Sequence, residues 1–154
     1  MTSEPIDRGR ADHAVVAFAH ALTGRLEQLA AVPVWSMTPG EHREALPELA
    51  RAEAQLAALR LRVLAEAERS GAGAERAAAS AADWVAIETR QTRISARSDL
   101  TLAQALEGHP VLAGALETGH ANLAQARAIV TALDRLPSTG EFAVEADRRI
   151  RAED

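Results

Sequence analysis

Cysteine, tyrosine and lysine are all absent from this chain of 154 residues. Without cysteine, the protein can have no disulfide, no thiol nucleophile and no thiolate metal site. Without lysine, Schiff-base chemistry and a phosphate-binding P-loop lysine are excluded as well. All 17 basic side chains are therefore arginines. Together with the abundant alanine, this usage indicates a GC-rich genome rather than a function.

Aromatic residues are scarce, at 3% of the chain, although 47% of its residues are hydrophobic. A core of Ala, Leu and Val lets helices approach closely, whereas a sheet favours β-branched and aromatic residues. The length suits one compact domain. We therefore expect an all-α fold, a single multi-helix bundle over residues 13–154 that follows a flexible N-terminal arm at residues 1–12.

Long apolar runs are missing too. No segment approaches the length of a membrane span, and the N-terminus lacks the apolar stretch of a signal peptide. Since the absence of cysteine also fits a reducing compartment, we expect a cytoplasmic protein with no membrane partner. The formal net charge of −5 argues against a chain that coats nucleic acid nonspecifically, although a local group of arginines could still bind it.

Apolar residues at helical spacing predict a first helix from His13 that ends at Pro33. Trp35 follows, and we expect it to plug the core over the helix ends. Thr38 and Glu41 have the spacing of a capping box, with a proline at the first helical position between them. A second helix should therefore start here.

Pro47 is expected to interrupt or kink this second helix, because proline removes a backbone donor and clashes with the preceding turn. A long central helix is then predicted over residues 48–70. Leu61 and Leu64 widen its apolar stripe, which indicates neighbours on two sides. Its main buried face is expected to comprise Leu49, Ala52, Leu56, Leu59, Val63 and Ala67.

Ser80 and Asp83 predict the cap of a short helix that runs to about Arg90 and buries Trp84 and Ile87. A helix-turn-helix-like run over residues 93–136 follows, with helices at 93–107, 110–118 and 123–136. The first of these helices is expected to start after Thr92 and to stop at Gly108, and the second to start at Pro110 and to stop at Gly119. The third is expected to start after Asn122, with Gln125 completing its cap, and to stop at Pro137. Their expected core residues are Leu100, Ala103 and Leu106; Val111, Leu112, Ala115 and Leu116; and Leu123, Ala126, Ile129, Val130 and Leu133.

A last helix is predicted from Ser138, with Phe142, Ala146 and Ile150 on one face. It reaches Asp154 with no stop signal, so we expect the chain to be a fragment of a longer protein.

No catalytic motif is present. The sequence lacks HExxH, GxSxG, GxxxxGK[ST] and GxGxxG. His13 and His20 share a predicted helix face, but no third ligand converges there. We therefore predict no catalytic residue, no metal site and no cofactor in this chain.

Arginines are the remaining candidates for function. Arg90, Arg93 and Arg97 surround a predicted helix start, and Arg127 lies one turn into the helix at 123–136. Together they could grip phosphates. The alternative is that they are solvated, or paired with Glu88, Asp99 and Asp134.

A set of spacings resembles the actinobacterial domain of unknown function 222, also called the 13E12 repeat family. The resemblance covers roughly residues 40–150, and Asn122 stands where that family commonly has a capping Ser. The residues that carry it are Ser80-Ala-Ala-Asp-Trp84, the helix from Thr92 to Leu106, His109-Pro110, Ala115-Leu116-Glu-Thr-Gly119, and Asn122-Leu-Ala-Gln-Ala126-Arg-Ala-Ile129 with Leu136-Pro137.

The resemblance implies an N-terminal helical module that precedes a metal-dependent HNH endonuclease domain. No nuclease residue can be carried over, because the Cys pair and paired His of an HNH site are absent here, so any divalent metal would belong to the missing module. We therefore expect a module that assists DNA binding or positioning and is not catalytic by itself. The first alternative is a structural helical domain that forms a homodimer or packs on its own HNH domain without touching nucleic acid. The second is a small helical enzyme with an Arg-lined pocket.

Overall fold

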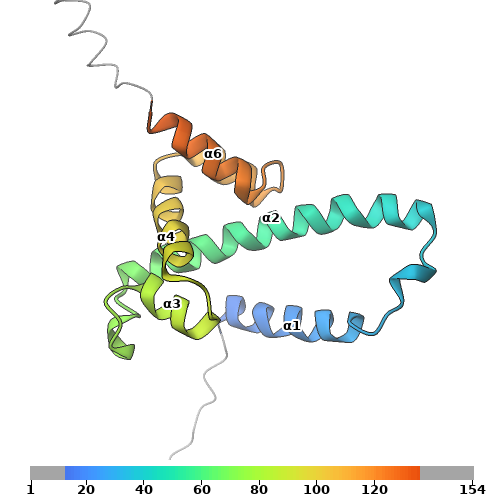
Figure 1. Cartoon of the computed structure of the whole chain (residues 1–154), viewed down its shortest axis with the longest axis horizontal. Helices are drawn as coiled ribbons and strands as arrows, with labels where there is room; N and C mark the ends of the chain where they lie inside the picture. Colours follow the sequence, from blue (N-terminus) through green and yellow to red (C-terminus); the bar gives the residue numbers. More distant parts are fainter. Residues whose placement is uncertain (1–12, 136–154) are drawn as a thin grey trace, which may run out of the picture. The chain divides into compact units, whose positions relative to one another are not determined.

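The computed structural model describes residues 13–135 of the chain. Within that range the protein consists of helices without a strand (Figure 1), so the predicted all-α class is confirmed. None of these helices is long and apolar enough to cross a membrane. The predicted arm at 1–12 and the predicted last helix, with Phe142, Ala146 and Ile150, lie outside the described residues. The α-helices are α1 (Ala14–Leu29), α2 (Pro39–Arg69), α3 (Ala81–Thr89), α4 (Arg93–Glu107), α5 (Pro110–Glu117) and α6 (Leu123–Leu133), with 3-10 turns at Val34–Ser36 and Ala74–Arg76.

The chain divides into two compact units, one that ends at His42 and one that begins at Arg43. Each is described by itself below. The expectation of one domain over 13–154 stays a prediction.

The first unit contains α1 and the start of α2. The His13 ring caps α1, since its Nδ1 accepts a hydrogen bond from the backbone N–H of Val15 at 3.2 Å. Trp35 is 84% exposed, so its predicted role as a core plug is wrong. The physical reason is that no residue between 13 and 42 is buried. This unit holds no core of its own for an indole ring to fill.

The start of α2 is the predicted capping box. The Glu41 carboxylate accepts from the backbone N–H of Thr38 at 2.6 Å and from the Thr38 hydroxyl at 2.8 Å. The Thr38 hydroxyl accepts in turn from the Glu41 N–H at 3.3 Å. These bonds favour the charged carboxylate, and with a smaller contribution from His42 they lower the pKa of Glu41.

Pro47 lies inside α2, which runs without a break from Pro39 to Arg69. The predicted interruption is therefore wrong. A proline in a helix removes one backbone hydrogen bond and crowds the carbonyl four residues earlier, but this one lies within the first three turns, where its surroundings are solvent-exposed. The helical turns that follow are enough to hold the backbone in register.

The second unit has its core between α2 and the four later helices. Leu61 and Leu116 are its largest fully buried side chains. One cluster joins α2 to α4, α5 and α6 and consists of Ala54, Ala58, Leu61, Ala65, Leu102, Ala103, Leu106, Leu112, Leu116, Ala126 and Val130. A second joins α2 to α3 and α4 and consists of Leu64, Ala81, Ala82, Ala86, Ala96 and Leu100.

The buried face of α2 is not the predicted one. Its core residues are mainly alanines, whereas Leu49 is 63% exposed and Val63 is 47% exposed. The alanines of this face are buried against side chains of α4, α5 and α6. The leucine-rich stripe therefore lies on the other side of the helix, and only the expectation of a two-sided apolar helix agrees with the structure.

The helix ends follow the predicted caps closely. Ser80, Thr92 and Asn122 each accept a hydrogen bond from a backbone N–H three residues later, and Asn122 forms a reciprocal capping box with Gln125. Gly119 has a φ of +75° after α5. The bonds from Gly119 N–H to Leu116 and from His120 N–H to Ala115 complete a Schellman motif.

A few predictions for these helices are wrong. Gly108 has a φ of −83°, so the end of α4 needs no left-handed glycine. The α6 helix ends at Leu133 rather than at residue 136. Ile87 and Val111 are exposed rather than buried, and Ile129 and Leu133 are only partly covered. Apolar residues at the edge of a helical face are common on surfaces, so periodicity alone overcounts the core.

Candidate nucleic-acid interface

Asp99 on α4 is the centre of a network that joins three helices. Its carboxylate is nearly buried, with 5% of the side chain exposed. Oδ2 accepts from Arg60 Nη2 on α2 at 2.8 Å, and Oδ1 accepts from Arg127 Nη2 on α6. Arg127 also donates through Nη1 to the backbone oxygen and hydroxyl of Ser98. A buried carboxylate needs such partners, and here two guanidinium groups supply them.

A second carboxylate holds Arg97. Arg97 Nη2 lies 3.1 Å from Oδ1 and 3.3 Å from Oδ2 of Asp83, which is in the first turn of α3. The Asp83 side chain is 12% exposed and that of Arg97 is 64% exposed. The pair therefore ties α3 to α4 at the edge of the bundle, where solvent weakens it.

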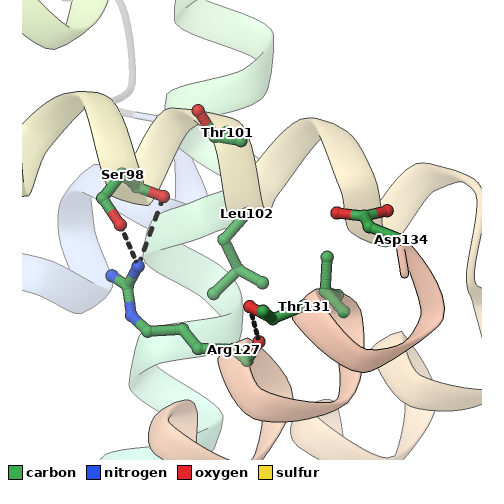
Figure 2. Close-up of a pocket in the computed structure, with 7 residues that line it drawn as sticks. Ser98, Thr101, Leu102, Arg127, Thr131 and Asp134 are labelled. Carbon is green, nitrogen blue, oxygen red and sulfur yellow. Dashed lines mark hydrogen bonds between the residues drawn. The ribbon is translucent and has the colours of Figure 1, made fainter.

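A hollow of about 420 Å³ lies between α4 and α6. Figure 2 shows Arg127 at one end of it, bonded to Ser98, and Asp134 at the other. Two hydroxyls in the hollow are already engaged with the backbone, since Thr101 donates to the Arg97 oxygen and Thr131 donates to the Arg127 oxygen. Its charged groups are engaged or at the rim, so the hollow lacks an unpaired cation for an anionic ligand.

The turn between α3 and α4 carries the two other candidate arginines. Arg90 ends α3 in the left-handed region, with a φ of 56°, and Arg93 is the first residue of α4. Both are exposed, and neither has an ion pair within residues 13–135. We call Arg90, Arg93 and the N-terminus of α4 the α3–α4 corner.

The α4 N-terminus adds to the positive potential of this corner. Thr92 caps the helix by accepting from the Ser95 N–H at 3.1 Å. The first turn of α4 contains no acidic residue. The helix dipole and the first backbone N–H groups therefore act in the same direction as the two guanidinium groups.

The four predicted site residues thus fall into two kinds. Arg97 and Arg127 are held by carboxylates, whereas Arg90 and Arg93 stand together at the corner. Of the expected partners, Asp99 does pair with an arginine. The sequence did not predict the pairing of Arg97 with Asp83 or of Asp99 with Arg60. The two members of each pair lie on different helices, and no sequence spacing links them. One signal was available: an aspartate among the apolar positions of α4 needs a cation.

Metal-binding groups are not found in the described part of the chain. No cluster of three or more His, Asp or Glu side chains there is placed to hold an ion.

The fold defines this protein as an all-α helical bundle. Comparison with known proteins adds no relative: no family model, no curated protein and no solved structure matches the chain.

Proposed function

We propose that this chain is a helical module that binds the sugar-phosphate backbone of DNA through the α3–α4 corner. As the resemblance to domain of unknown function 222 suggests, it would position DNA for an HNH endonuclease domain of the same protein. Cleavage and the divalent metal would belong to that domain. The observation that supports the proposal is the pair of exposed arginines, Arg90 and Arg93, beside a helix N-terminus without acidic residues.

Phosphate is the chemical group that this corner fits. A helix N-terminus offers backbone N–H donors to an anion, and arginine donates two parallel bonds to phosphate oxygens. Arg90 is the exposed residue that ends α3, and Arg93 begins α4 only three residues later. Two neighbouring phosphates on one strand would satisfy both guanidinium groups.

The contact should depend little on base sequence. The last helix of the helix-turn-helix-like run is α6, and its one arginine, Arg127, is engaged with Asp99 and Ser98. Base readout needs free donors and acceptors in a groove. The net charge of −5 opposes general attraction of the chain to DNA, so the affinity of the isolated module should be low and strongly salt-dependent.

The test is a binding titration of the full chain with a fluorescent duplex at low ionic strength. The R90A/R93A variant should bind about tenfold more weakly, since each phosphate contact contributes about 1 kcal/mol or less. The matched control is R62A/R69A, which removes two exposed arginines from α2. An equal loss in both variants, or no binding by the wild-type chain, contradicts the proposal.

A second candidate is a helical interaction module without nucleic-acid contact. It is favoured by one specific observation, the exposed leucine-rich stripe of α2, which includes Leu49 and Leu56. The wild-type chain would then bind no DNA in the titration above, while its association state would depend on α2.

A further inference from the structure

The side of α2 that faces away from the helical core carries an apolar stripe. Leu49, Leu56 and Val63 repeat at intervals of seven residues and are 63%, 41% and 47% exposed. Seven residues are close to two helical turns, so the three side chains form a line along one face. Ala52 and the half-buried Leu59 lie beside this line. We call these five residues the α2 stripe.

Apolar lines of this kind pack against another helix in water. A strip of leucines at heptad spacing exceeds the scattered apolar residues that a monomer surface normally shows. The core of this unit uses the opposite face, through Ala54, Ala58 and Ala65. The α2 stripe is therefore a second packing face of the same helix rather than part of its core.

We propose that the α2 stripe binds the α2 stripe of a second copy of this chain, with the two helices antiparallel and a two-fold axis near Leu56. In this register Leu56 meets its own copy. Leu49 meets Val63 of the second copy, because each lies seven residues from the axis. The inference concerns α2 alone and does not depend on DNA contact at the α3–α4 corner.

Charge complementarity supports the antiparallel direction. Glu53 and Arg60 lie three residues before and four residues after Leu56, on the same flank of the stripe. The antiparallel pair places Glu53 of each copy opposite Arg60 of the other, which forms two symmetric ion pairs. Arg60 uses Nη2 to bond Asp99, and 44% of its side chain remains exposed, so other N–H groups can donate.

A parallel pair lacks this match. In a parallel two-helix pair with Leu49, Leu56 and Val63 at the interface, Glu48 of one copy would lie beside Glu53 of the other. Like charges at flanking positions disfavour that arrangement. The charges along α2 therefore favour the self-complementary antiparallel pair over the parallel one.

The first test is the association state of the full chain, measured by sedimentation at high micromolar concentration. The wild-type chain should be a dimer, and L56E should dissociate at least about tenfold more readily. V111E is the matched control, because it places the same charge at an exposed apolar position on α5. A monomeric wild-type chain, or equal dissociation of L56E and V111E, overturns the proposal.

The second test identifies which residues of the two α2 helices meet, and it leaves the apolar face of the helix intact. Because the chain has no cysteine, single cysteines report contacts without background. L56C should form a disulfide dimer on mild oxidation. L49C and V63C should cross-link when mixed, and each alone should cross-link much less. Efficient cross-linking of L49C alone indicates a parallel pair and overturns the register, and failure of L56C to cross-link overturns the interface.

Discussion

Two pairs of arginines, suggested by the same sequence argument, have different surroundings in the structure. Arg97 and Arg127 each meet a carboxylate from another part of the bundle, Asp83 and Asp99. Arg90 and Arg93 meet none within the described range and are exposed at the end of α3 and the start of α4. The difference lies in whether a second helix brings an acidic group alongside, which no local pattern of arginines reveals.

This comparison separates arginines that hold the bundle together from arginines available to a ligand. A buried carboxylate such as Asp99 cannot give up its cation without a large penalty. Its partners are therefore poor candidates for DNA contact. An exposed arginine without a partner keeps its hydration and can exchange it for phosphate at little cost to the fold.

The largest expected effect is at Asp99. D99A leaves Arg60 and Arg127 facing each other across the centre of the network without an anion. We expect a loss of about 2–3 kcal/mol in the free energy of unfolding, below the ~3–5 kcal/mol of a fully buried pair because both arginines are partly exposed. Urea unfolding measures it. D99N keeps the shape but also removes the negative charge, so it should cost nearly as much as D99A, and a D99N variant as stable as the wild-type chain would argue against an ionic network.

The next largest effects are the losses in unfolding free energy when Arg127 or Arg97, the two arginines that pair with carboxylates, is removed. R127A removes bonds to Asp99 and to Ser98 and should cost about 1–2 kcal/mol. R97A removes a partner that is 64% exposed and should cost less than about 1 kcal/mol. Unfolding of both variants under the same conditions gives the order directly. The reverse order would show that α3, rather than α6, depends on its ion pair.

A smaller effect of opposite sign is expected at the corner. Arg90 has a φ of 56°, a region that costs a non-glycine residue about 1 kcal/mol. R90G should therefore stabilise the fold by about 0.5–1 kcal/mol while it removes a proposed DNA contact. R93A should leave stability unchanged within about 0.5 kcal/mol. Destabilisation by R90G would mean that this side chain has a structural partner.

The smallest effect concerns a carboxylate that needs no arginine. Glu41 is held by Thr38, and these hydrogen bonds lower its pKa from the ordinary value of a glutamate. The pKa of Glu41 is lower in the folded chain than in the unfolded chain. The capping box therefore stabilises the fold at pH values above the ordinary pKa of a glutamate, and this stabilisation is lost as the pH falls through the folded pKa. An NMR titration of the Glu41 side chain measures the shift. T38V should move the pKa upward, and no change in that variant would exclude the hydroxyl as a cause.

The caps could be predicted from the sequence because they are local. Thr38 with Glu41 and Asn122 with Gln125 satisfy backbone donors three residues away, so no other part of the chain is needed to recognise them. The bounds of α4 followed from Thr92 in the same way. Such short-range hydrogen bonds explain why the starts of α2, α3, α4 and α6 could be predicted.

The buried face of α2 depends on packing between helices and was predicted wrongly. Apolar periodicity gives leucine more weight than alanine, so it predicts a core of Leu49, Leu56 and Val63, which the structure leaves exposed. The structure instead buries Ala54 and Ala58 in the core that α2 shares with α4, α5 and α6. The same limit applied to the site: Asp83 and Arg60 reach their partners only after the helices pack.

The most direct test of the division between the two pairs of arginines is the salt dependence of duplex binding by the wild-type chain and the R90A/R93A variant. The slope of log K against log salt concentration changes by about 0.9 for each phosphate contact on duplex DNA. The account predicts a slope about two units shallower in R90A/R93A and an unchanged slope in R97A. Equal slopes in the wild-type chain and R90A/R93A, or a shallower slope in R97A alone, would contradict it.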